Sequence, residues 1–319
     1  MKVVLPSNLA AQIEPHLSNE DRSVRLDLQG NLDSNASDAE VYFHEWSYNA
    51  YFERVLAQLP NLRWLHTESA GIDHLLTPAL LSRDLIVTNS ARVHAIPIAE
   101  FVLAYMLDRA KCLSKFKLAQ QQNHWLSYPE VEALGLQELM SATVLIIGAG
   151  GIGQAIATRA KAFGMRVWGS CLHPRSLSGF DLVVGDREWR KLLPEVDYVI
   201  LATPLTAQTK HLIDAKVLQS MQASTYLINI ARGEIIDENA LIHALQKGWI
   251  AGAALDAFAI EPLPSDSQLR SLPNLFITPH CSGISKQMQQ RVVELFLENL
   301  ALYRAGKPLR NIVDKAAGY

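Results

Sequence analysis

Three ionisable side chains in this chain of 319 residues stand where apolar, β-like runs of sequence end: Arg232, Glu261 and His280. A planar guanidinium can bind a carboxylate and polarise the carbonyl next to it, and a protonated imidazole can donate a proton. Each residue alone has a plainer interpretation, as a surface charge, part of a Glu-Pro turn or a structural histidine. Because the carboxyl ends of neighbouring parallel strands meet at one edge of a sheet, the three together favour a shared site.

Upstream of these residues, an apolar run leads directly into a glycine-rich turn and the start of a helix. Residues 143–153 read TVLIIGAGGIG, and a second β-like run follows the helix at Met165–Ser170. In such a turn the first glycine permits a sharp bend, the second lets the backbone approach a pyrophosphate, and the last lets the helix pack on the strand. This order favours a dinucleotide site over a glycine-rich turn without a ligand. The site would use the backbone of Gly148, Gly150, Gly151, Ile152 and Gly153.

The elements that must position these residues fall into two groups, and a chain of this length can form two hydrophobic cores. The β-like runs of the first group are Val3–Leu5, Val24–Leu28, Val41–Phe43, Leu62–His66 and Leu85–Thr88. After the glycine turn the runs are Met165–Ser170, Asp197–Ala202, Thr225–Asn229, Gly252–Leu255 and Leu275–Ile277. A helix that begins near Pro97 is expected to join the two groups and to be buried.

We therefore predict an α/β fold of two domains. Residues 99–283 would form a Rossmann domain, a doubly wound parallel sheet that binds the dinucleotide. Residues 1–98 would form a smaller, flavodoxin-like substrate domain, completed by residues 284–319 because residues 287–305 have the apolar spacing of a helix that could return to it. Ligands would bind in a cleft between the domains, at the carboxyl ends of the strands.

Composition argues against several classes of protein. Lys and Arg number 29 and Asp and Glu number 32, so the net charge of −3 provides no field that would gather nucleic acid or an anionic membrane. No apolar run approaches the roughly 20 residues that span a bilayer. The three cysteines are scattered, and the histidines lack the short paired spacing of zinc sites. We expect a cytoplasmic protein that binds small molecules, without a metal, nucleic-acid or membrane partner.

The chain resembles the D-isomer-specific 2-hydroxyacid dehydrogenases, whose motifs occur in order over nearly its whole length. The matching segments are Ser69-Ala-Gly-Ile-Asp73, Ala99-Glu100, the glycine turn, Thr203-Pro-Leu-Thr-Ala-Gln-Thr209, Asn229-Ile-Ala-Arg-Gly233, Ala254-Leu-Asp-Ala-Phe258, Glu261-Pro262 and Pro279-His280. The resemblance implies NAD(P)H-dependent reduction of a 2-oxo acid to the D-2-hydroxy acid, with Arg232, Glu261 and His280 as the catalytic residues.

The same resemblance implies further contacts. The backbone of Ala70 and Gly71 would receive the substrate carboxylate, and Asp256 would lie near the nicotinamide carboxamide. The other implied cofactor contacts are Thr203, Pro204, Ile230 and Ala231.

The chemistry of such a reduction fits these side chains. Arg232 can bind the substrate carboxylate and polarise the adjacent carbonyl. As hydride reaches the carbonyl carbon from the nicotinamide ring, protonated His280 can neutralise the oxygen. Glu261 would bind the other ring nitrogen, which orients the imidazole and favours its protonated form.

The segment after the second strand of the dinucleotide motif bears on the choice of cofactor. An NAD site usually has an acidic residue there for the ribose 2′-hydroxyl, but Cys171 and its neighbours include no carboxylate. Ser170, His173 and Arg175 could instead bind a 2′-phosphate, so we predict a preference for NADP(H), with NAD(H) possible. The alternative is that Arg175 points into solvent and both cofactors are used.

The substrate and the oligomeric state are less closely defined. Trp46 and Trp125 resemble tryptophans near the substrate in glyoxylate and hydroxypyruvate reductases, which favours those 2-oxo acids, although both could be core or interface aromatics. The helix near Pro97 is apolar on most sides, so we expect it to expose more apolar surface than one cleft could cover, and this surface to be buried in a two-fold homodimer built on the dinucleotide domain. The rival functions are a nucleotide-sensing scaffold of the same fold and an NAD-dependent hydrolase of the homocysteine type, which would need a larger substrate domain.

Overall fold

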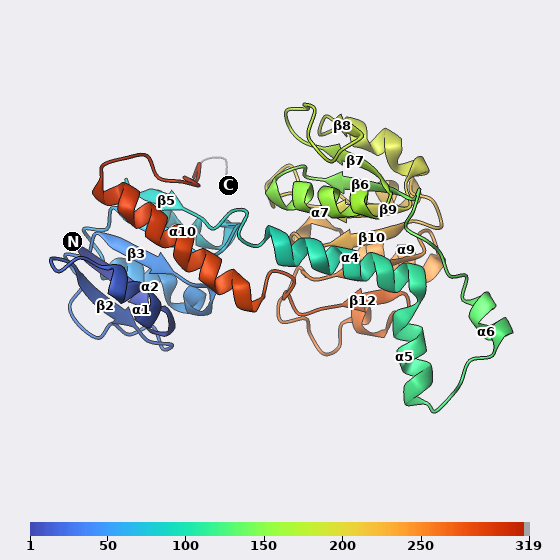
Figure 1. Cartoon of the computed structure of the whole chain (residues 1–319), viewed down its shortest axis with the longest axis horizontal. Helices are drawn as coiled ribbons and strands as arrows, with labels where there is room; N and C mark the ends of the chain where they lie inside the picture. The colour runs from blue at the N-terminus through green and yellow to red at the C-terminus, as the bar shows by residue number, and fades with distance from the viewer. Residues whose placement is uncertain (316–319) are drawn as a thin grey trace. The chain divides into compact units, whose positions relative to one another are not determined.

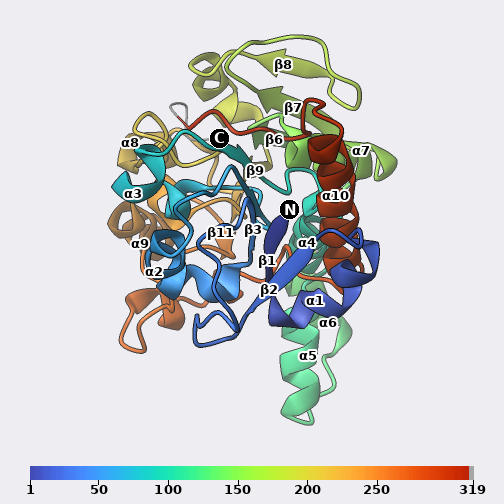
Figure 2. The same ribbon diagram turned by 90° about the vertical axis from the view of Figure 1, so that its left-hand side faces the viewer.

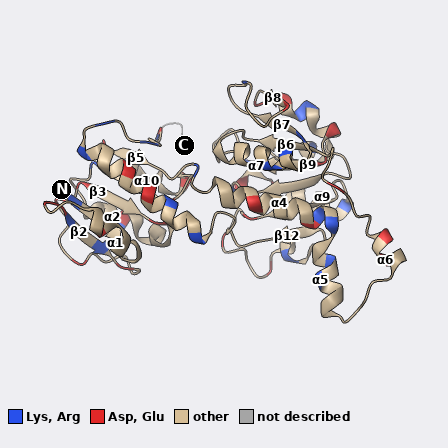
Figure 3. Cartoon of the chain, in the orientation of Figure 1, with Lys and Arg blue, Asp and Glu red and all other residues tan. Residues whose placement is uncertain are grey.

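The computed structural model describes residues 1–315 and contains two compact units, each with its own parallel β-sheet (Figure 1). One unit comprises residues 1–94 and the described residues from Ser285 onward, and the other comprises Ala95–Ile284. Within the described part of the chain, no helix is long and apolar enough to cross a membrane. Basic and acidic residues are interspersed along both units in Figure 3, in keeping with the small net charge.

The sheet of the first unit has the strand order β2-β1-β3-β4-β5, and every neighbouring pair is parallel. Its strands are β1 (Lys2–Pro6), β2 (Arg22–Leu26), β3 (Val41–His44), β4 (Trp64–Thr67) and β5 (Ile86–Thr88). This is the order of flavodoxin-like sheets, so the predicted flavodoxin-like fold is confirmed. Each β-like run predicted in this part of the chain forms a strand.

Helices cover both faces of this sheet. They are α1 (Ser7–Ile13), α2 (Phe52–Ala57), α3 (Pro78–Leu81) and α10 (Lys286–Arg304), with 3-10 segments at Glu14–His16, Trp46–Tyr51 and Asp73–Leu75. Because alternate residues of a strand face opposite sides, Val3 and Leu5 pack with α1 and α10, whereas Val4 packs with α2 and α3. Helix α10 also contacts α1 (Figure 2). The C-terminal helix is thus part of the core of the first unit.

The sheet of the second unit has the strand order β12-β11-β10-β9-β6-β7-β8, again with every neighbouring pair parallel. Its strands are β6 (Thr143–Ile147), β7 (Arg166–Ser170), β8 (Leu182–Val184), β9 (Tyr198–Leu201), β10 (Tyr226–Asn229), β11 (Gly252–Leu255) and β12 (Leu275–Ile277). From β6 the chain adds β7 and β8 on one side of the sheet, and from β9 it adds β10, β11 and β12 on the other side. This reversal confirms the predicted doubly wound sheet. Strand β8 is absent from the prediction, because a run this short shows no recognisable period.

The helices of the second unit include the predicted helix near Pro97, which exposes less apolar surface than expected. They are α4 (Ala95–Lys111), α5 (Leu113–Gln121), α6 (Tyr128–Ala133), α7 (Gly151–Ala162), α8 (Ala215–Gln219) and α9 (Glu238–Lys247), with 3-10 segments at Glu188–Glu195, Gly233–Ile235 and Gln268–Ser271. Helix α4 packs against α7 and buries Val102, Tyr105 and Met106. The expectation that α4 exposes a large apolar surface is therefore wrong.

Exposed apolar side chains gather instead on residues 113–136, which contain α5 and α6 and which we call the arm. The arm stands away from the rest of the second unit in Figure 1. Trp125 in this segment is 93% exposed, so it is not a core residue.

Candidate active site

The glycine turn lies between β6 and α7, at the point where the strand order reverses. Gly148 has a φ of 107°, and a Cβ atom there would lie 2.4 Å from a carbonyl oxygen just after β9. A Cβ atom on Gly153 would lie 2.2 Å from the carbonyl oxygen of Gly148, whereas the space beside Gly150 is open. Only glycine fits at positions 148 and 153. The open space before the first turn of α7, which begins with Gly151 and Ile152, can admit a pyrophosphate.

The residues predicted to select the cofactor lie at and after the end of β7. Ser170 is 3% exposed, and its carbonyl oxygen accepts hydrogen bonds from the N–H groups of Gly148 and Ala149, at 3.1 and 2.9 Å. His173 and Arg175 are exposed, and Arg175 lines a cavity of about 310 Å³ beside β8. The backbone of Ser170 therefore holds the glycine turn through these two hydrogen bonds. Of the three residues predicted to bind a 2′-phosphate, only His173 and Arg175 have exposed side chains.

The loop after β9 borders the glycine turn. The backbone nitrogen of Thr203 lies 2.8 Å from the position that a Cβ atom on Gly148 would take. This loop is closed on itself, because the hydroxyl of Thr209 donates to the carbonyl oxygen of Pro204 at 2.6 Å. Thr203 and Pro204 thus lie beside the turn that can admit a pyrophosphate.

Arg232 follows β10 in a loop shaped by a buried asparagine. Asn229 accepts a hydrogen bond from the N–H of Ala231 at 3.0 Å and donates one to the carbonyl oxygen of Arg232 at 2.9 Å. Ile230 and Ala231 are buried between them, and the guanidinium of Arg232 donates to the carbonyl oxygen of Ala231 at 2.9 Å. Asn229 therefore turns the chain after β10 and sets where the guanidinium emerges. An asparagine at the end of a predicted strand is the local signal for such a turn.

Gly233 brings the loops after β10 and β11 into contact. A Cβ atom there would lie 1.9 Å from the carbonyl carbon of Phe258 and 2.1 Å from the backbone nitrogen of Ala259. No residue with a side chain fits this approach without moving the backbone. The approach places Arg232 alongside the segment that carries Glu261.

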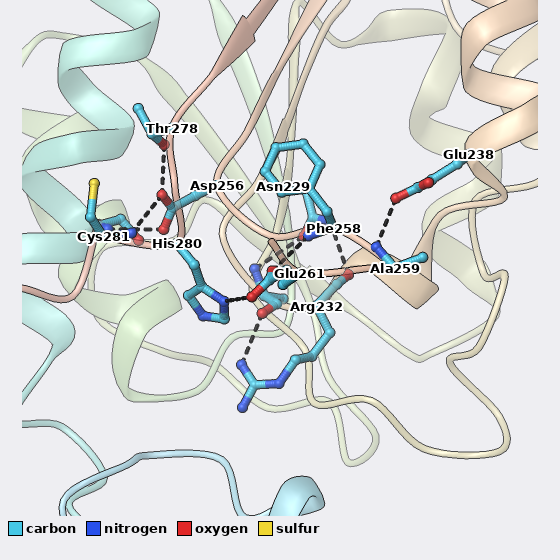
Figure 4. A network of polar contacts seen from close by, with 12 residues as sticks. Asn229, Arg232, Glu238, Asp256, Phe258, Ala259, Glu261, Thr278, His280 and Cys281 are labelled. Atoms are coloured by element: carbon cyan, nitrogen blue, oxygen red, sulfur yellow. Dashed lines mark hydrogen bonds and ion pairs between the residues drawn. The ribbon is translucent and has the colours of Figure 1, made fainter. Parts of the chain in front are cut away.

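Glu261 and His280 form a hydrogen-bonded pair (Figure 4). Nδ1 of His280 lies 2.8 Å from Oε2 of Glu261, and Oε1 of Glu261 accepts the N–H of Phe258 at 2.8 Å. Figure 4 shows the guanidinium of Arg232 extending into the same space as the imidazole. The structure thus brings the three predicted ionisable residues together, with Nε2 as the ring nitrogen directed away from Glu261.

The surroundings of Glu261 favour its ionised form. Partial burial acts to raise the pKa of Glu261, but hydrogen bonds from His280 and from the N–H of Phe258, together with the charges of His280 and Arg232, outweigh it. The pKa of Glu261 is therefore below its ordinary value of 4.5. Because an ionised carboxylate can only accept a hydrogen bond, the proton of this contact is on Nδ1 of His280.

Asp256 is buried beneath the loop that carries His280. It is 1% exposed, and its carboxylate accepts the hydroxyl of Thr278 at 2.6 Å and the two backbone N–H groups that follow His280, both at 2.9 Å. The hydroxyl of Tyr105, in α4, lies 2.5 Å from the hydroxyl of Thr278. These bonds anchor a loop in which His280 has a φ of 51°, in the left-handed region.

This anchoring network is not apparent in the sequence. The family resemblance implies a cofactor contact for Asp256, and nothing marks Thr278 or Tyr105 as its supports. The three residues are separated by long stretches of chain, so no local spacing reports their contact.

Trp46 lies at the end of β3 in the first unit, at the start of a 3-10 segment. It is 46% exposed, its ring centroid is 4.6 Å from that of His74, and its backbone N–H donates to Oε1 of Glu68 at 2.8 Å. Trp46 is therefore not a core residue. Burial raises the pKa of Glu68 to about 7, with the Trp46 hydrogen bond opposing this and the charge of Glu45 adding to it.

Ala70 and Gly71 follow β4, directly after Glu68. Both are partly exposed, and the carbonyl oxygen of Ala70 accepts a hydrogen bond from the side-chain amide of Asn89 at 2.7 Å. The predicted carboxylate-binding segment is thus tied to the loop after β5.

These features define a class of protein. A doubly wound sheet with a glycine turn at the reversal of strand order binds a dinucleotide. An arginine beside a carboxylate–imidazole pair can bind an acid and transfer a proton. The second unit therefore has the parts of a nicotinamide-dependent oxidoreductase.

Comparison with other proteins gives the family. The sequence model for the NAD binding domain of D-isomer specific 2-hydroxyacid dehydrogenase matches residues 103–282. A glyoxylate reductase from Pyrococcus furiosus is 34% identical to the chain, and the match covers 82% of the chain and 79% of that protein. The crystal structure of a family member from Aeromonas salmonicida has 32% identity and a TM-score of 0.87 over 98% of both chains. Another, from Xanthobacter autotrophicus in complex with NADPH and MES, has 27% identity and a TM-score of 0.84, covering 100% of this chain and 99% of that one.

The chain belongs to the D-isomer-specific 2-hydroxyacid dehydrogenase family. It is an NAD(P)-dependent oxidoreductase, as its motifs predict.

Proposed function

We propose that this dehydrogenase uses NADPH to reduce glyoxylate or hydroxypyruvate to the 2-hydroxy acid, in the D configuration where the product is chiral. The observation that carries the proposal is the 2.8 Å contact between Nδ1 of His280 and Oε2 of Glu261, with Arg232 beside it (Figure 4). The contact orients His280, an acid–base group, near Arg232, an anion-binding group, where the neighbouring strands β10, β11 and β12 end.

In this mechanism Arg232 and the backbone N–H groups of Ala70 and Gly71 bind the substrate carboxylate. When bound, the nicotinamide supplies the hydride. Nε2 of His280 donates its proton to the carbonyl oxygen, and Glu261 stabilises the positive charge that the ring carries before the transfer. The guanidinium polarises the carbonyl as negative charge develops on its oxygen.

The role of His280 is tested by the oxidation of NADPH with hydroxypyruvate. We expect His280→Asn to lower kcat by about 10²- to 10⁴-fold, the usual contribution of a general acid, with little change in the KM for NADPH. His124→Asn is the matched control, since Nε2 of His124 also lies 2.8 Å from a carboxylate, that of Glu130 in the arm. Unchanged turnover in His280→Asn would remove His280 from the mechanism. A wild-type chain that binds NADPH without reducing any 2-oxo acid would favour a nucleotide-sensing scaffold.

The preference for NADPH is supported by the segment after β7. Residues 170–175 contain no carboxylate, and the exposed His173 and Arg175 could bind a 2′-phosphate. The nearby carboxylate of Asp181 is paired with Lys161 at 2.8 Å. We expect Arg175→Ala to raise the KM for NADPH about tenfold and to leave that for NADH unchanged. A clear kinetic advantage for NADH in the wild-type enzyme would contradict this proposal.

The proposed substrates are supported by the similarity to a glyoxylate reductase and by the half-exposed Trp46 at the end of β3. A screen of small 2-oxo acids tests them. We expect glyoxylate and hydroxypyruvate to give the highest kcat/KM, and strong activity on branched or aromatic 2-oxo acids alone would contradict the proposal.

We also propose that the enzyme is a homodimer in which the arm forms the contact. The arm exposes Leu113, Leu118, Trp125 and Tyr128 by 54%, 53%, 93% and 82%. Soluble monomers seldom expose so much apolar surface in one short segment. A second copy of the chain is the partner, because two-fold symmetry lets one patch cover the same patch on its neighbour.

A further inference from the structure

The loop after β4 presents two adjacent backbone N–H groups, those of Ala70 and Gly71. Both residues are partly exposed, and within residues 1–315 neither N–H group donates a hydrogen bond to the chain. Successive backbone N–H groups in a turn can bind an anion. Their alignment therefore decides how well a carboxylate is held.

The carbonyl groups of the same peptide units are held on the opposite side. The carbonyl oxygen of Ser69 accepts the N–H of Ser90 at 3.0 Å, and that of Ala70 accepts Nδ2 of Asn89 at 2.7 Å. In a trans peptide unit the C=O group of one residue and the N–H group of the next point in opposite directions. Because both carbonyls are directed toward the loop after β5, the N–H groups of Ala70 and Gly71 point away from it.

Asn89 is itself held by the chain that follows α10, residues 305–315, which we call the C-terminal segment. It is 7% exposed, and its backbone N–H donates to the carbonyl oxygen of Asn311 at 3.1 Å. In return, Nδ2 of Asn311 donates to the carbonyl oxygens of Asn89 and Ala91, at 3.2 and 3.1 Å. Asn311 has a φ of 55°, a left-handed conformation that asparagine tolerates better than most residues. An antiparallel bridge between Thr88 and Ile312 adds a contact with β5.

The C-terminal segment is anchored in turn to α10. Asn299, fully buried in that helix, accepts the N–H of Arg310 at 2.7 Å and donates to the carbonyl oxygen of the same residue at 3.1 Å. A continuous series of hydrogen bonds therefore runs from α10 through the C-terminal segment to the carbonyl oxygen of Ala70. Buried polar networks that are satisfied in this way rigidify the groups they join.

We propose that Asn89, supported by Asn311, is a positioning residue for substrate binding. It fixes the peptide units of residues 69–71 so that the N–H groups of Ala70 and Gly71 are aligned for the carboxylate of the 2-oxo acid before that substrate arrives. The proposal rests on the carboxylate-binding role proposed above for these N–H groups. A hydrogen bond to the carbonyl of Ala70 also polarises its peptide unit and makes the N–H of Gly71 a stronger donor. Donors held in place beforehand cost less free energy to order on binding.

Glyoxylate reduction with NADPH, together with inhibition by oxamate as a carboxylate that is not reduced, tests the proposal. Asn89→Ala removes the donor to Ala70, and the nearly isosteric Asn89→Asp replaces it with an acceptor. We expect both variants to raise the KM for glyoxylate and the inhibition constant of oxamate about tenfold, which equals ~1.4 kcal/mol or one net hydrogen bond. The kcat and the KM for NADPH should change far less. Asn311→Gly keeps the left-handed backbone accessible but removes two donors, so it should give a smaller rise in the same constants.

Asn61→Ala is the matched control, since Asn61 also donates from its side chain to a backbone carbonyl of the first unit, that of Ser37 at 2.8 Å. This variant should keep the wild-type constants. The proposal is overturned if folded Asn89→Asp and Asn311→Gly proteins retain the wild-type constants for glyoxylate and oxamate, or if the KM for NADPH rises equally. A wild-type enzyme that reduces no 2-oxo acid would instead refute the proposed function, so the two failures are distinguishable.

Discussion

Glu261 contacts His280 with one carboxylate oxygen and the N–H of Phe258 with the other. Glutamine in its place would keep the size of the side chain and lose the charge that stabilises the protonated imidazole. We expect Glu261→Gln to lower kcat for hydroxypyruvate by at least about tenfold at neutral pH, but by less than His280→Asn does. Turnover equal to that of the wild type would show that the contact only orients the loop.

The lowered pKa of Glu261 also determines how this residue affects stability as the pH changes. Because its pKa in the folded chain lies below the ordinary value of 4.5, the ionised side chain stabilises the folded state fully above pH 4.5. That contribution is lost as the pH falls through the folded pKa. The free energy of unfolding, measured from pH 7 down to pH 3, should therefore decrease more steeply for the wild type than for Glu261→Gln. Parallel curves would contradict this expectation.

Glu68 should show the opposite dependence on pH, because burial raises its pKa to about 7. The protonated side chain favours the folded state fully below the ordinary value of 4.5, and this contribution is lost as the pH rises to about 7. Glu68→Gln keeps an acceptor for the N–H of Trp46 but carries no charge. We expect it to raise the free energy of unfolding by about 1 to 3 kcal/mol at pH 8 and by little at pH 4.5, measured by urea denaturation. An equal effect at both values would contradict the raised pKa.

Two loops of the second unit depend on the absence of a side chain at Gly233, since a Cβ atom there would lie 1.9 Å from the backbone of Phe258. We expect Gly233→Ala to separate the loops after β10 and β11, to lower the free energy of unfolding by about 1 to 3 kcal/mol and to reduce kcat/KM. Gly185→Ala is the control, because its Cβ atom would meet only the end of the Glu188 side chain, at 3.2 Å. A Gly233→Ala enzyme with wild-type stability and activity would show that the loops can part without cost.

The elements of both sheets could be predicted from the sequence because buried parallel strands are continuous apolar runs. The short strand β8 could not, since Leu182–Val184 is too brief to show a pattern. The surroundings of Asp256 could not be predicted either. Its partners Thr278 and Tyr105 become neighbours only when β11, β12 and α4 pack together.

At the scale of the whole molecule, the arm predicts the oligomeric state. We expect light scattering to give twice the chain mass of 35.4 kDa for the wild type. Trp125→Ser removes the most exposed large apolar side chain of the arm. We expect it to shift the mass toward that of the monomer, because a tryptophan that becomes buried in an interface often supplies much of the binding free energy. Leu28→Ser, at a 63% exposed position of the first unit, should leave the dimer intact. A wild-type chain that is monomeric at micromolar concentration would remove the arm as a dimer contact.

The sequence by itself determined the α/β class, the doubly wound and flavodoxin-like sheets, the glycine turn and the family, because each depends on residues that are close together along the chain. Only the tertiary structure decided that α4 is covered while the arm is exposed, and that the carbonyl of Ser170 accepts hydrogen bonds from the glycine turn. It alone also decided that Asn89 is hydrogen-bonded to both Asn311 and Ala70. Burial and hydrogen bonds of this kind join residues that are distant in sequence. They depend on which strands lie next to one another in each sheet, and no local pattern of residues determines that arrangement.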